Sequence, residues 1–358
     1  MIISIDKSSS IIEFKKLIQT AAANERTQGL FILSCDKNDY EPEVVKKILN
    51  EVQVPVFGGI FPEIIYGREK IDTGVIVVSL SKKPKVAVIE NLNHSDTDVN
   101  KQIEQQLTDL PDFKTIFVFV DGMSKQITPF INTIFDKFGP NYNYIGGGAG
   151  SLSYKHKPCI FTNQGLVEDS AIIALMNVQS GIGVSHGWKT IAGPYKVTNA
   201  AKNKIMELNW KPAFDLYRDI IRIHSGKSIT RDNFSEISKH YPLGLKKAVT
   251  DSIVREPLMI DENGSLVCIG DVPRNSFINI LNGNINTLIG GAQMALALSR
   301  EEFDTDRRCD LTFFIDSMSR VLFLEDKFSL ELEAVYNDDN PFIGALTLGE
   351  IANNGKDY

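Results

Sequence analysis

One order of segments occurs three times in the chain, and it constrains the fold more than any other feature. A buried strand ends at an aspartate, a helix with a clear start follows, and the next strand carries glycine. In the first instance "LFILSCD" ends at Asp36 and "VPVFGGI" contains Gly58. In the second, "TIFVFVDG" ends its strand at Asp121 and "YNYIGGGAG" contains Gly147. A pattern that returns at this length predicts a repeated structural unit.

A third instance lies near the C-terminus, where "LTFFIDSMSR" ends a strand at Asp316 and "PFIGALTLGEI" contains Gly344. The first two units form an internal duplication near residues 10–92 and 97–188. Helices that alternate with strands and then give way to runs of strands predict an α+β fold, with mixed β-sheets and helices on their outer faces. We expect "GVIVVSL" and "KVAVIE" to extend the first sheet as antiparallel strands, because their connections are short.

The length of the chain favours two domains. A chain of 358 residues exceeds what one hydrophobic core usually serves. The polar segment "HSGKSITRDNFSEISKH", from His224 to His240, is typical of a boundary between domains. We therefore predict domains at residues 1–223 and 224–358.

The composition excludes several classes of partner. The net charge is -7 and no long run of lysine or arginine occurs, which argues against nucleic acid and against an anionic membrane surface. The start of the sequence has no signal-peptide pattern, and no stretch has the length of a membrane span. The four cysteines are far apart without a C-x-x-C pair. We expect a cytoplasmic protein without membrane insertion.

The glycine run from Gly146 to Gly150, interrupted by Ala149, has no phosphate-binding pattern. A lysine is absent where a P-loop needs one, and Ser151 stands where the dinucleotide fingerprint needs glycine. Two interpretations remain open. The missing Cβ atoms allow close packing against another part of the chain, or they leave a floor on which a small ligand rests.

A set of segments in a fixed order resembles the FIST signal-transduction family. The set is "YNYIGGGAG", "GVSHGWKTIAGPYKVTNA", "YPLGL", "DENGSLVCIGDVP", "FFIDSMSR" and "NPFIGALTLGEIA". The resemblance covers nearly the whole chain and implies a FIST N-terminal domain followed by a FIST C-terminal domain. It also implies a bacterial intracellular sensor for a small ligand, with amino acids the usual proposal, rather than an enzyme.

The resemblance favours a ligand site near the glycine run and the domain interface. Arg320 and Glu350 match charged positions of the family's C-terminal pattern, and they could hold the carboxylate and ammonium groups of an amino acid. The alternative is that they pair with each other or with the neighbouring domain. The expected ligand-binding residues are Gly147, Gly148, Ala149, Asp121, Trp188, Arg320 and Glu350.

Other functions stay open as alternatives. Some family members are haem proteins that sense nitric oxide, and His186 in "GVSHGW" is the candidate haem ligand here. A hydrolase would use Ser151, Ser153, His156 or Cys159, but no nucleophile motif is present. A pure interaction scaffold is the third alternative. We expect no catalytic residue, no metal site and no cofactor.

The resemblance also implies how a signal leaves the protein. The chain carries no output domain, so we expect it to act in trans on a partner such as a histidine kinase, a cyclase or a chemoreceptor. Relatives usually continue beyond "GEIANNGKDY" into one more short segment, so the resemblance implies a truncated C-terminus.

Overall fold

The structure, a computed structural model, describes residues 1–358 except 109, 111, 154, 247–251, 304–307 and 355–358. The expectation of a truncated C-terminus concerns that last range and lies outside the described residues. Two compact units are present, and each combines separate parts of the chain. Unit 1 is Met1–Gly183, Leu296–Val321 and Phe328–Tyr358, and unit 2 is Val184–Ala295 and Leu322–Lys327.

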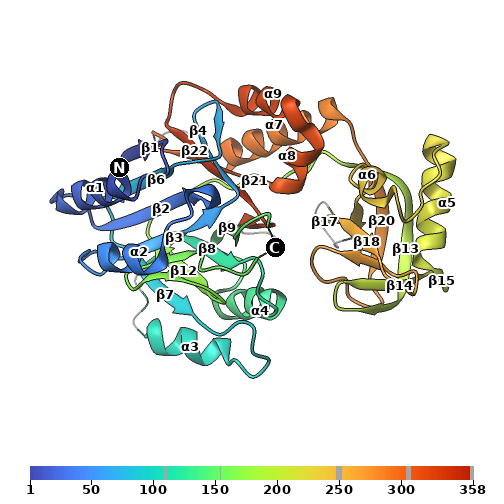
Figure 1. Ribbon diagram of the computed structural model, residues 1–358, viewed down its shortest axis with the longest axis horizontal. Coiled ribbons are helices and arrows are strands. Elements are labelled where there is room, and N and C mark those ends of the chain that lie inside the picture. The colour runs from blue at the N-terminus through green and yellow to red at the C-terminus, as the bar shows by residue number, and fades with distance from the viewer. Residues whose placement is uncertain (109, 111, 154, 247–251, 304–307, 355–358) are drawn as a thin grey trace. The chain divides into compact units, whose positions relative to one another are not determined.

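Unit 1 begins with a six-stranded sheet in the order β1-β6-β2-β3-β10-β11 (Figure 1). Strands β2 and β3 are parallel, and the other neighbours are antiparallel. The Ser10 hydroxyl caps α1 by accepting the Glu13 N–H, and Pro42 opens α2. The strands are β1 (Ile2–Asp6), β2 (Gly29–Cys35), β3 (Val56–Phe61), β6 (Val75–Leu80), β10 (Ile160–Thr162) and β11 (Gly165–Val167), and the helices are α1 (Ile11–Ala23), η1 (Asp36–Asn38) and α2 (Pro42–Leu49).

The second sheet of unit 1 has the order β23-β9-β8-β12-β7, with β8 and β9 parallel. Two glutamines of α3 bond to the backbone of edge strand β7: Gln106 exchanges hydrogen bonds with Val88, and Gln102 does so with Glu90 just beyond the strand. They satisfy edge groups that otherwise invite another strand. The elements are β7 (Lys85–Ile89), α3 (Val99–Gln106), β8 (Thr115–Asp121), α4 (Ile127–Phe138), β9 (Asn143–Ala149), β12 (Ala171–Met176) and β23 (Glu350–Asn354).

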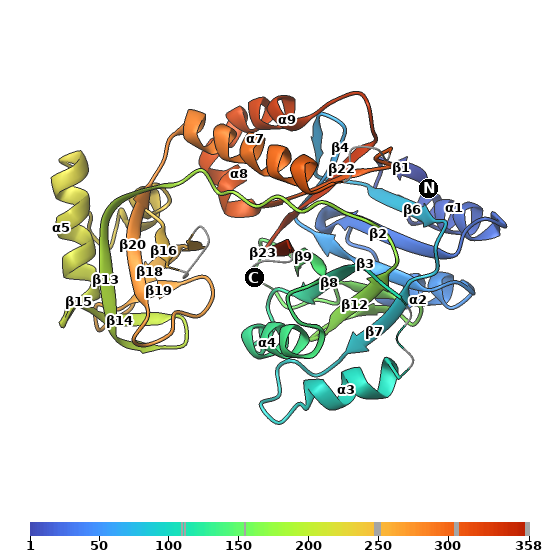
Figure 2. The ribbon, with the colours of Figure 1, turned by 180° about the vertical axis from the view of Figure 1, so that it is seen from behind.

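The expectation that "GVIVVSL" and "KVAVIE" extend one sheet is wrong. Both strands are antiparallel to their neighbours, but β6 pairs with β1 and β2 whereas β7 pairs with β12 in the second sheet (Figure 2). The partner of β7 is far away in the sequence, so the short connection between β6 and β7 gave a misleading indication.

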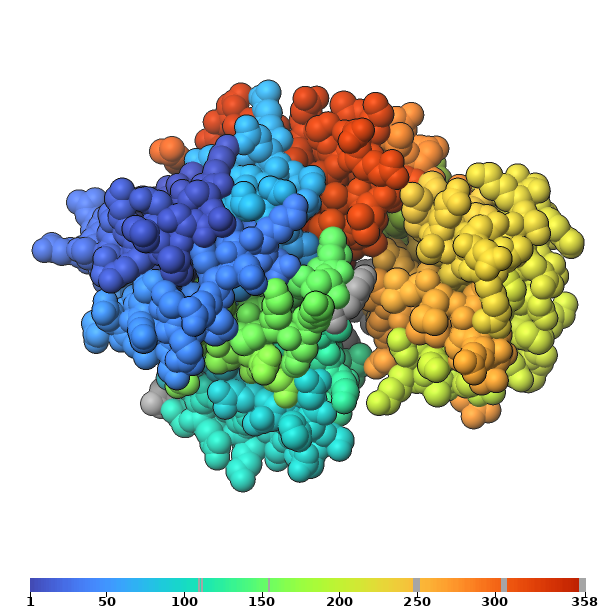
Figure 3. Space-filling view, in the orientation of Figure 1, coloured from blue at the N-terminus to red at the C-terminus, as the bar shows by residue number. Residues whose placement is uncertain are grey.

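The third sheet of unit 1 joins early and late parts of the sequence in the order β21-β22-β4-β5. Strands β21 and β22 are parallel, and β22 is antiparallel to β4. The space-filling view shows light-blue and red residues side by side where these strands meet (Figure 3). The elements are β4 (Glu63–Tyr66), β5 (Glu69–Ile71), β21 (Thr312–Ser317), α8 (Met318–Leu324), α9 (Phe328–Val335) and β22 (Phe342–Thr347). The end of α8 and the short η2 (Glu325–Lys327) that follows it belong to unit 2.

The three predicted repeats are confirmed as strand–helix–strand units, each with one parallel strand pair. The glycine has the same task in each: a Cβ atom there would overlap a backbone carbonyl oxygen of the partner strand. The sequence comparison used Gly147 for the second repeat, whereas the structure gives this position to Gly146. The glycines and the carbonyl groups that they face are Gly58 and Ile32, Gly146 and Val118, and Gly344 and Phe314.

Unit 2 is built on one antiparallel sheet in the order β17-β16-β20-β13-β14-β19-β18, with β15 paired to β14. Its core packs Tyr217 and Ile221 of α5 against the sheet. The predicted boundary between residues 223 and 224 lies inside α5, and as a division between domains it stays a prediction. The elements are β13 (Lys189–Ala201), β14 (Lys204–Leu208), β15 (Lys211–Pro212), α5 (Ala213–Ser225), α6 (Phe234–Ser238), β16 (Leu243–Leu245), β17 (Ile253–Arg255), β18 (Pro257–Ile260), β19 (Leu266–Cys268) and β20 (Phe277–Asn282).

Helix α7 (Ile285–Glu302) begins in unit 2 and ends in unit 1. It is the longest helix in the described ranges. Among all the residues that the structure describes, no helix has both the length and the hydropathy of a membrane-spanning segment.

Candidate functional site

The glycine-bearing strands of all three repeats meet at their carboxyl ends within unit 1. The Gly150 N–H donates to the carbonyl of Ile60 in β3, at 2.8 Å. The Gly148 carbonyl accepts the Leu348 N–H at 2.9 Å, just beyond β22, and the Gly148 N–H donates to Gly349 at 2.8 Å. In open α/β sheets, ligands bind beyond the carboxyl ends of parallel strands. This edge of unit 1 is therefore the first place to look for a site.

Gly147 and Gly148 are covered by the protein's own chain. A Cβ atom at Gly147 would lie 2.7 Å from the Gly349 carbonyl oxygen and 2.8 Å from Cγ2 of Thr347. At Gly148 it would lie 2.9 Å from the Leu348 carbonyl oxygen. Of the two interpretations of the glycine run, the geometry favours close packing. A direct ligand contact at these glycines stays a prediction.

Several of the expected binding residues do lie close together. Asp121 stands opposite Ala149 in the β8–β9 pair, and Glu350 stands opposite Gly147 in the β9–β23 pair. Residues that are far apart in the sequence are thus brought to neighbouring strands of one sheet.

Trp188 and His186 lie in unit 2, not with the glycine strand. The Trp188 ring packs against Phe323, with 5.2 Å between the ring centroids. A Cβ atom at Gly283 would lie 2.9 Å from this indole, so Trp188 is closely packed on a second side. The structure therefore gives Trp188 a packing role within unit 2.

The surroundings of His186 do not fit a haem ligand. Its Nδ1 accepts the Trp188 N–H at 3.0 Å, and its Nε2 is enclosed by protein. Iron coordination needs a ring nitrogen that faces the porphyrin. Neither ring nitrogen of His186 is open to a porphyrin, so this histidine does not fit the role of a haem ligand. Among the described residues, no cluster of three or more His, Cys, Asp or Glu side chains could hold a metal ion.

Asp121 is a buried carboxylate at the end of β8 with an organised set of donors. Its side chain is 1% exposed. The Met123 N–H donates to Oδ1 at 2.9 Å, and the Asp169 N–H donates to Oδ2 at 2.8 Å. Nε2 of His156 lies 2.6 Å from the same Oδ2, and this histidine is about one-third exposed at 35%. A buried anion is thus covered by one side chain that reaches solvent.

The loop from Gly150 to Cys159 joins the ends of the first two repeats. Ser151 donates its hydroxyl to Oδ2 of Asp36 at 2.5 Å, directly after β2. The Lys157 ammonium lies 3.1 Å from Asp39 on the exposed side of the loop. We call Asp36, Asp121, Ser151 and His156 the carboxyl-end cluster. It places two carboxylates on the inner side of the loop, and the Lys157 ammonium lies next to it on the exposed side.

The carboxyl-end cluster lacks the arrangement of a hydrolase. Burial, followed by the nearby charge of Asp121, raises the pKa of the Cys159 thiol well above its ordinary value, so Cys159 is a poor nucleophile. Ser151 donates to Asp36 rather than to a base. Within the described ranges, no hydroxyl or thiol is hydrogen-bonded to His156, so a nucleophile–base pair is not assembled.

Arg320 lies in a second polar group of unit 1, which is buried. Its Nε donates to Oε1 and Oε2 of Glu331 at 2.9 and 3.1 Å, and it lies 3.4 Å from Oδ2 of Asp316. All three side chains are at most 8% exposed. We call these three residues the buried ion cluster. Arg320 was expected to clamp a ligand carboxylate, but Glu331 and Asp316 of the same chain hold its Nε.

The charges of the buried ion cluster affect one another. Burial, followed by the charge of Glu331, raises the pKa of Asp316 well above its ordinary value. Burial lowers the pKa of Arg320, but the carboxylates of Asp316 and Glu331 outweigh it and leave that pKa raised. Asp316 therefore keeps its proton to a higher pH than an ordinary aspartate does.

Two of these residues were missed in the sequence. Glu331 falls between Phe328, Leu332 and Val335 on the buried face of α9, so helical spacing alone would have flagged a buried carboxylate. Asp169 acts through its backbone N–H at a positive φ of 52°, and no residue pattern reveals such a donor.

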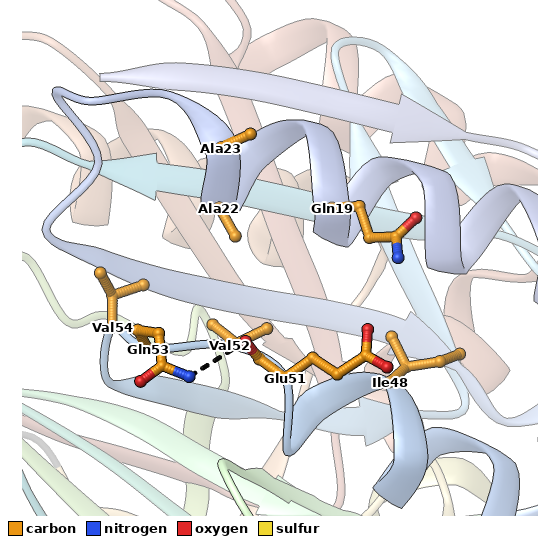
Figure 4. Close-up of a pocket in the computed structure, with 8 residues that line it drawn as sticks. All are labelled: Gln19, Ala22, Ala23, Ile48, Glu51, Val52, Gln53 and Val54. Atoms are coloured by element: carbon orange, nitrogen blue, oxygen red, sulfur yellow. Dashed lines mark hydrogen bonds between the residues drawn. The ribbon is translucent and has the colours of Figure 1, made fainter.

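A surface hollow of about 360 Å³ lies at the other edge of the first sheet, where β2 and β3 begin (Figure 4). Its floor is mostly apolar, and Glu51 is its one charged lining residue among those described. A hollow of this kind does not match a ligand with both an ammonium and a carboxylate group. The lining residues are Gln19, Ala22, Ala23, Ile48, Glu51, Val52, Gln53 and Val54.

Comparisons with known proteins give the same family along the chain. A family model described as the FIST N domain matches residues 29–211, and one described as the FIST C domain matches residues 213–353. A search of curated proteins finds no match.

Proposed function

Because the chain belongs to the FIST family, whose domains are sensor domains in signal transduction, we propose that it senses a small zwitterionic metabolite, such as an amino acid, at the carboxyl-end cluster. The observation that carries the proposal is the buried Asp121 carboxylate, covered by the partly exposed His156. A ligand ammonium group can replace the imidazole as the donor to Asp121. The ligand carboxylate can then pair with Lys157 at the exposed side of the loop.

Binding at this place would change the loop from Gly150 to Cys159. His156 and Ser151 tie the loop to Asp121 and Asp36, and a ligand that competes for these carboxylates weakens both ties. A ligand shifts a conformational equilibrium only by its difference in affinity between two states. Here the two states differ in whether Asp36 and Asp121 are bonded to the loop or are available to the ligand. We also propose that Gly147, Gly148, Ala149 and Glu350 line the ligand site, since they lie on strands next to Asp121 in the same sheet.

The proposed sensor acts in the cytoplasm and passes its signal in trans to a histidine kinase, a cyclase or a chemoreceptor. Four free cysteines, three of them buried, suit a reducing compartment. The family's role in signal transduction supports a signalling protein as the partner.

The test is a thermal-shift screen of the purified full chain against the twenty amino acids. Methylammonium and acetate serve as probes that carry only one of the two charges. A ligand at about 100 times its Kd stabilises a protein by about 2.7 kcal/mol, which is a shift of a few degrees. We expect at least one amino acid to produce such a shift and both single-charge probes to fail.

Two variants locate the site. His156→Gln should strengthen the response to the active amino acid, because a weaker donor then competes for Asp121, whereas His94→Gln, at another exposed histidine, should leave it unchanged. A response that is unchanged in His156→Gln and survives in Asp121→Asn would show that the ligand binds elsewhere. Failure of all twenty amino acids would overturn the zwitterion proposal.

A further inference from the structure

The buried ion cluster closes a loop around one short segment. Arg320 lies in the first turn of α8 and Glu331 in the first turn of α9, and their side chains are hydrogen-bonded at 2.9 and 3.1 Å. Between them the chain runs through Leu322–Lys327. The hydrogen bonds therefore hold the two ends of this segment together in unit 1.

The segment itself belongs to unit 2. Its Phe323 ring lies 5.2 Å from the Trp188 ring and 4.8 Å from the His240 ring, and both contacts are edge-on. Glu325 pairs with Lys239 at 3.3 Å, on the surface. The aromatic contacts fix the middle of the segment, while the buried ion cluster fixes its flanks.

The two kinds of fastening differ in strength. The Lys239–Glu325 pair is exposed, and such pairs contribute little. Arg320 and Glu331 are buried, so removing one partner leaves an uncompensated charge away from water. Asp316, whose Oδ2 is 3.4 Å from Arg320, adds a third ionisable group to the same place. The buried ion cluster thus holds the two ends of Leu322–Lys327 more firmly than the surface pair holds its middle.

We infer that the Arg320–Glu331 pair is a conformational clamp, which holds the two ends of Leu322–Lys327 together and so sets the position of Phe323 against Trp188. The inference goes beyond the proposed function, because it holds whatever ligand is sensed. If the cluster served only to stabilise unit 1, its loss would affect the core of that unit and the segment alike.

Trp188 reports on the clamp directly. The chain has two tryptophans, and Trp210→Phe removes the other, which is 74% exposed. In that background, Glu331→Gln should move the emission of Trp188 to longer wavelength and increase its quenching by acrylamide. Hydrogen exchange should show a loss of protection in Leu322–Lys327 with β8 and β12 unchanged. Lys70→Gln, which removes a less buried pair with Glu63 in unit 1, should change neither signal.

A double variant keeps the test decisive if Glu331→Gln does not fold. Arg320→Met with Glu331→Leu fills the same space without a buried unpaired charge, an exchange that buried pairs often tolerate. It should give the same red shift, and so should Phe323→Leu. Unchanged Trp188 emission and unchanged exchange in a folded variant would overturn the clamp. Equal loss of protection in the segment, β8 and β12 would overturn it as well. All measurements use ligand-free protein, so a failure here leaves the amino-acid proposal standing, and the reverse is also true.

Discussion

Asp121 and Asp316 stand at the carboxyl ends of corresponding strands in two repeats, yet their surroundings differ. Asp121 accepts two backbone N–H groups and contacts a histidine that reaches solvent. Asp316 accepts the Ser317 N–H on one oxygen and lies against Arg320 and Glu331, where its pKa is raised chiefly by burial. The repeat fixes where the carboxylate stands, and its neighbours decide whether it contacts a partly exposed histidine or a buried ion pair.

The largest effect should come from the glycine that both repeats share. Gly146→Ala places a Cβ atom onto the Val118 carbonyl, and Gly344→Ala does the same at Phe314. We expect each change to lower the free energy of unfolding by about 4 kcal/mol or more in urea titrations. Gly290→Ala is the control, because a Cβ atom in that helix meets nothing within 4 Å. If the three variants were equally stable, close strand approach would not explain the repeated glycine.

One isosteric substitution tests whether the donors around Asp121 stabilise the protein. In Asp121→Asn, an amide N–H₂ group must replace an oxygen that now accepts from a backbone N–H, so a buried donor loses its partner. The free energy of unfolding should fall by about 1–3 kcal/mol. Asp39→Asn, at an exposed carboxylate, should have almost no effect. Similar losses for the two variants would mean that the donors around Asp121 contribute nothing special.

The smallest of the three effects should be the contribution of Asp316 to the pH dependence of the free energy of unfolding. The pKa of Asp316 is higher in the folded protein than the ordinary 3.8, so folding binds a proton as the pH rises above that value. Its stabilising contribution is therefore complete below the unfolded pKa and is lost as the pH rises toward the folded pKa. Asparagine cannot ionise, so Asp316→Asn should make unfolding less dependent on pH.

Unfolding curves between about pH 4 and about pH 8 check this sign. Asp316→Asn should match the natural chain at the acid end and become increasingly more stable than it as the pH rises toward neutrality. A variant that is less stable than the natural chain at neutral pH would show that Asp316 is ionised in the folded protein.

Local patterns in the sequence predicted much of the fold. Apolar runs that end at Asp36, Asp121 and Asp316 did mark parallel strands, and Ser10 and Pro42 did mark the beginnings of helices. The pairing of distant strands could not be read in this way. Strand β7 joins β12, and β22 joins β4, because burial of complete sheet faces decides these partners, not the length of a connection.

The candidate site was predictable to a smaller extent. Asp36 and Asp121 were singled out as the ends of strands, and Ser151 and His156 as neighbours of the glycine run. One loop brings these four residues together because of how β2 and β8 are arranged in space. The spacing of residues in the sequence does not encode that arrangement. Trp188 was expected to bind the ligand, which stays a prediction, and its packing on Phe323 could not be foreseen because no pattern had marked Phe323.

The pairing of β23 with β9 also has a consequence for synthesis. A ribosome makes the first 183 residues of unit 1 long before it makes Glu350–Asn354, the strand that covers the edge of β9. Until then the backbone of the glycine strand stays open to other chains, and β4 still lacks β22. The nascent protein thus exposes two unpaired strand edges until β22 and β23 have been made.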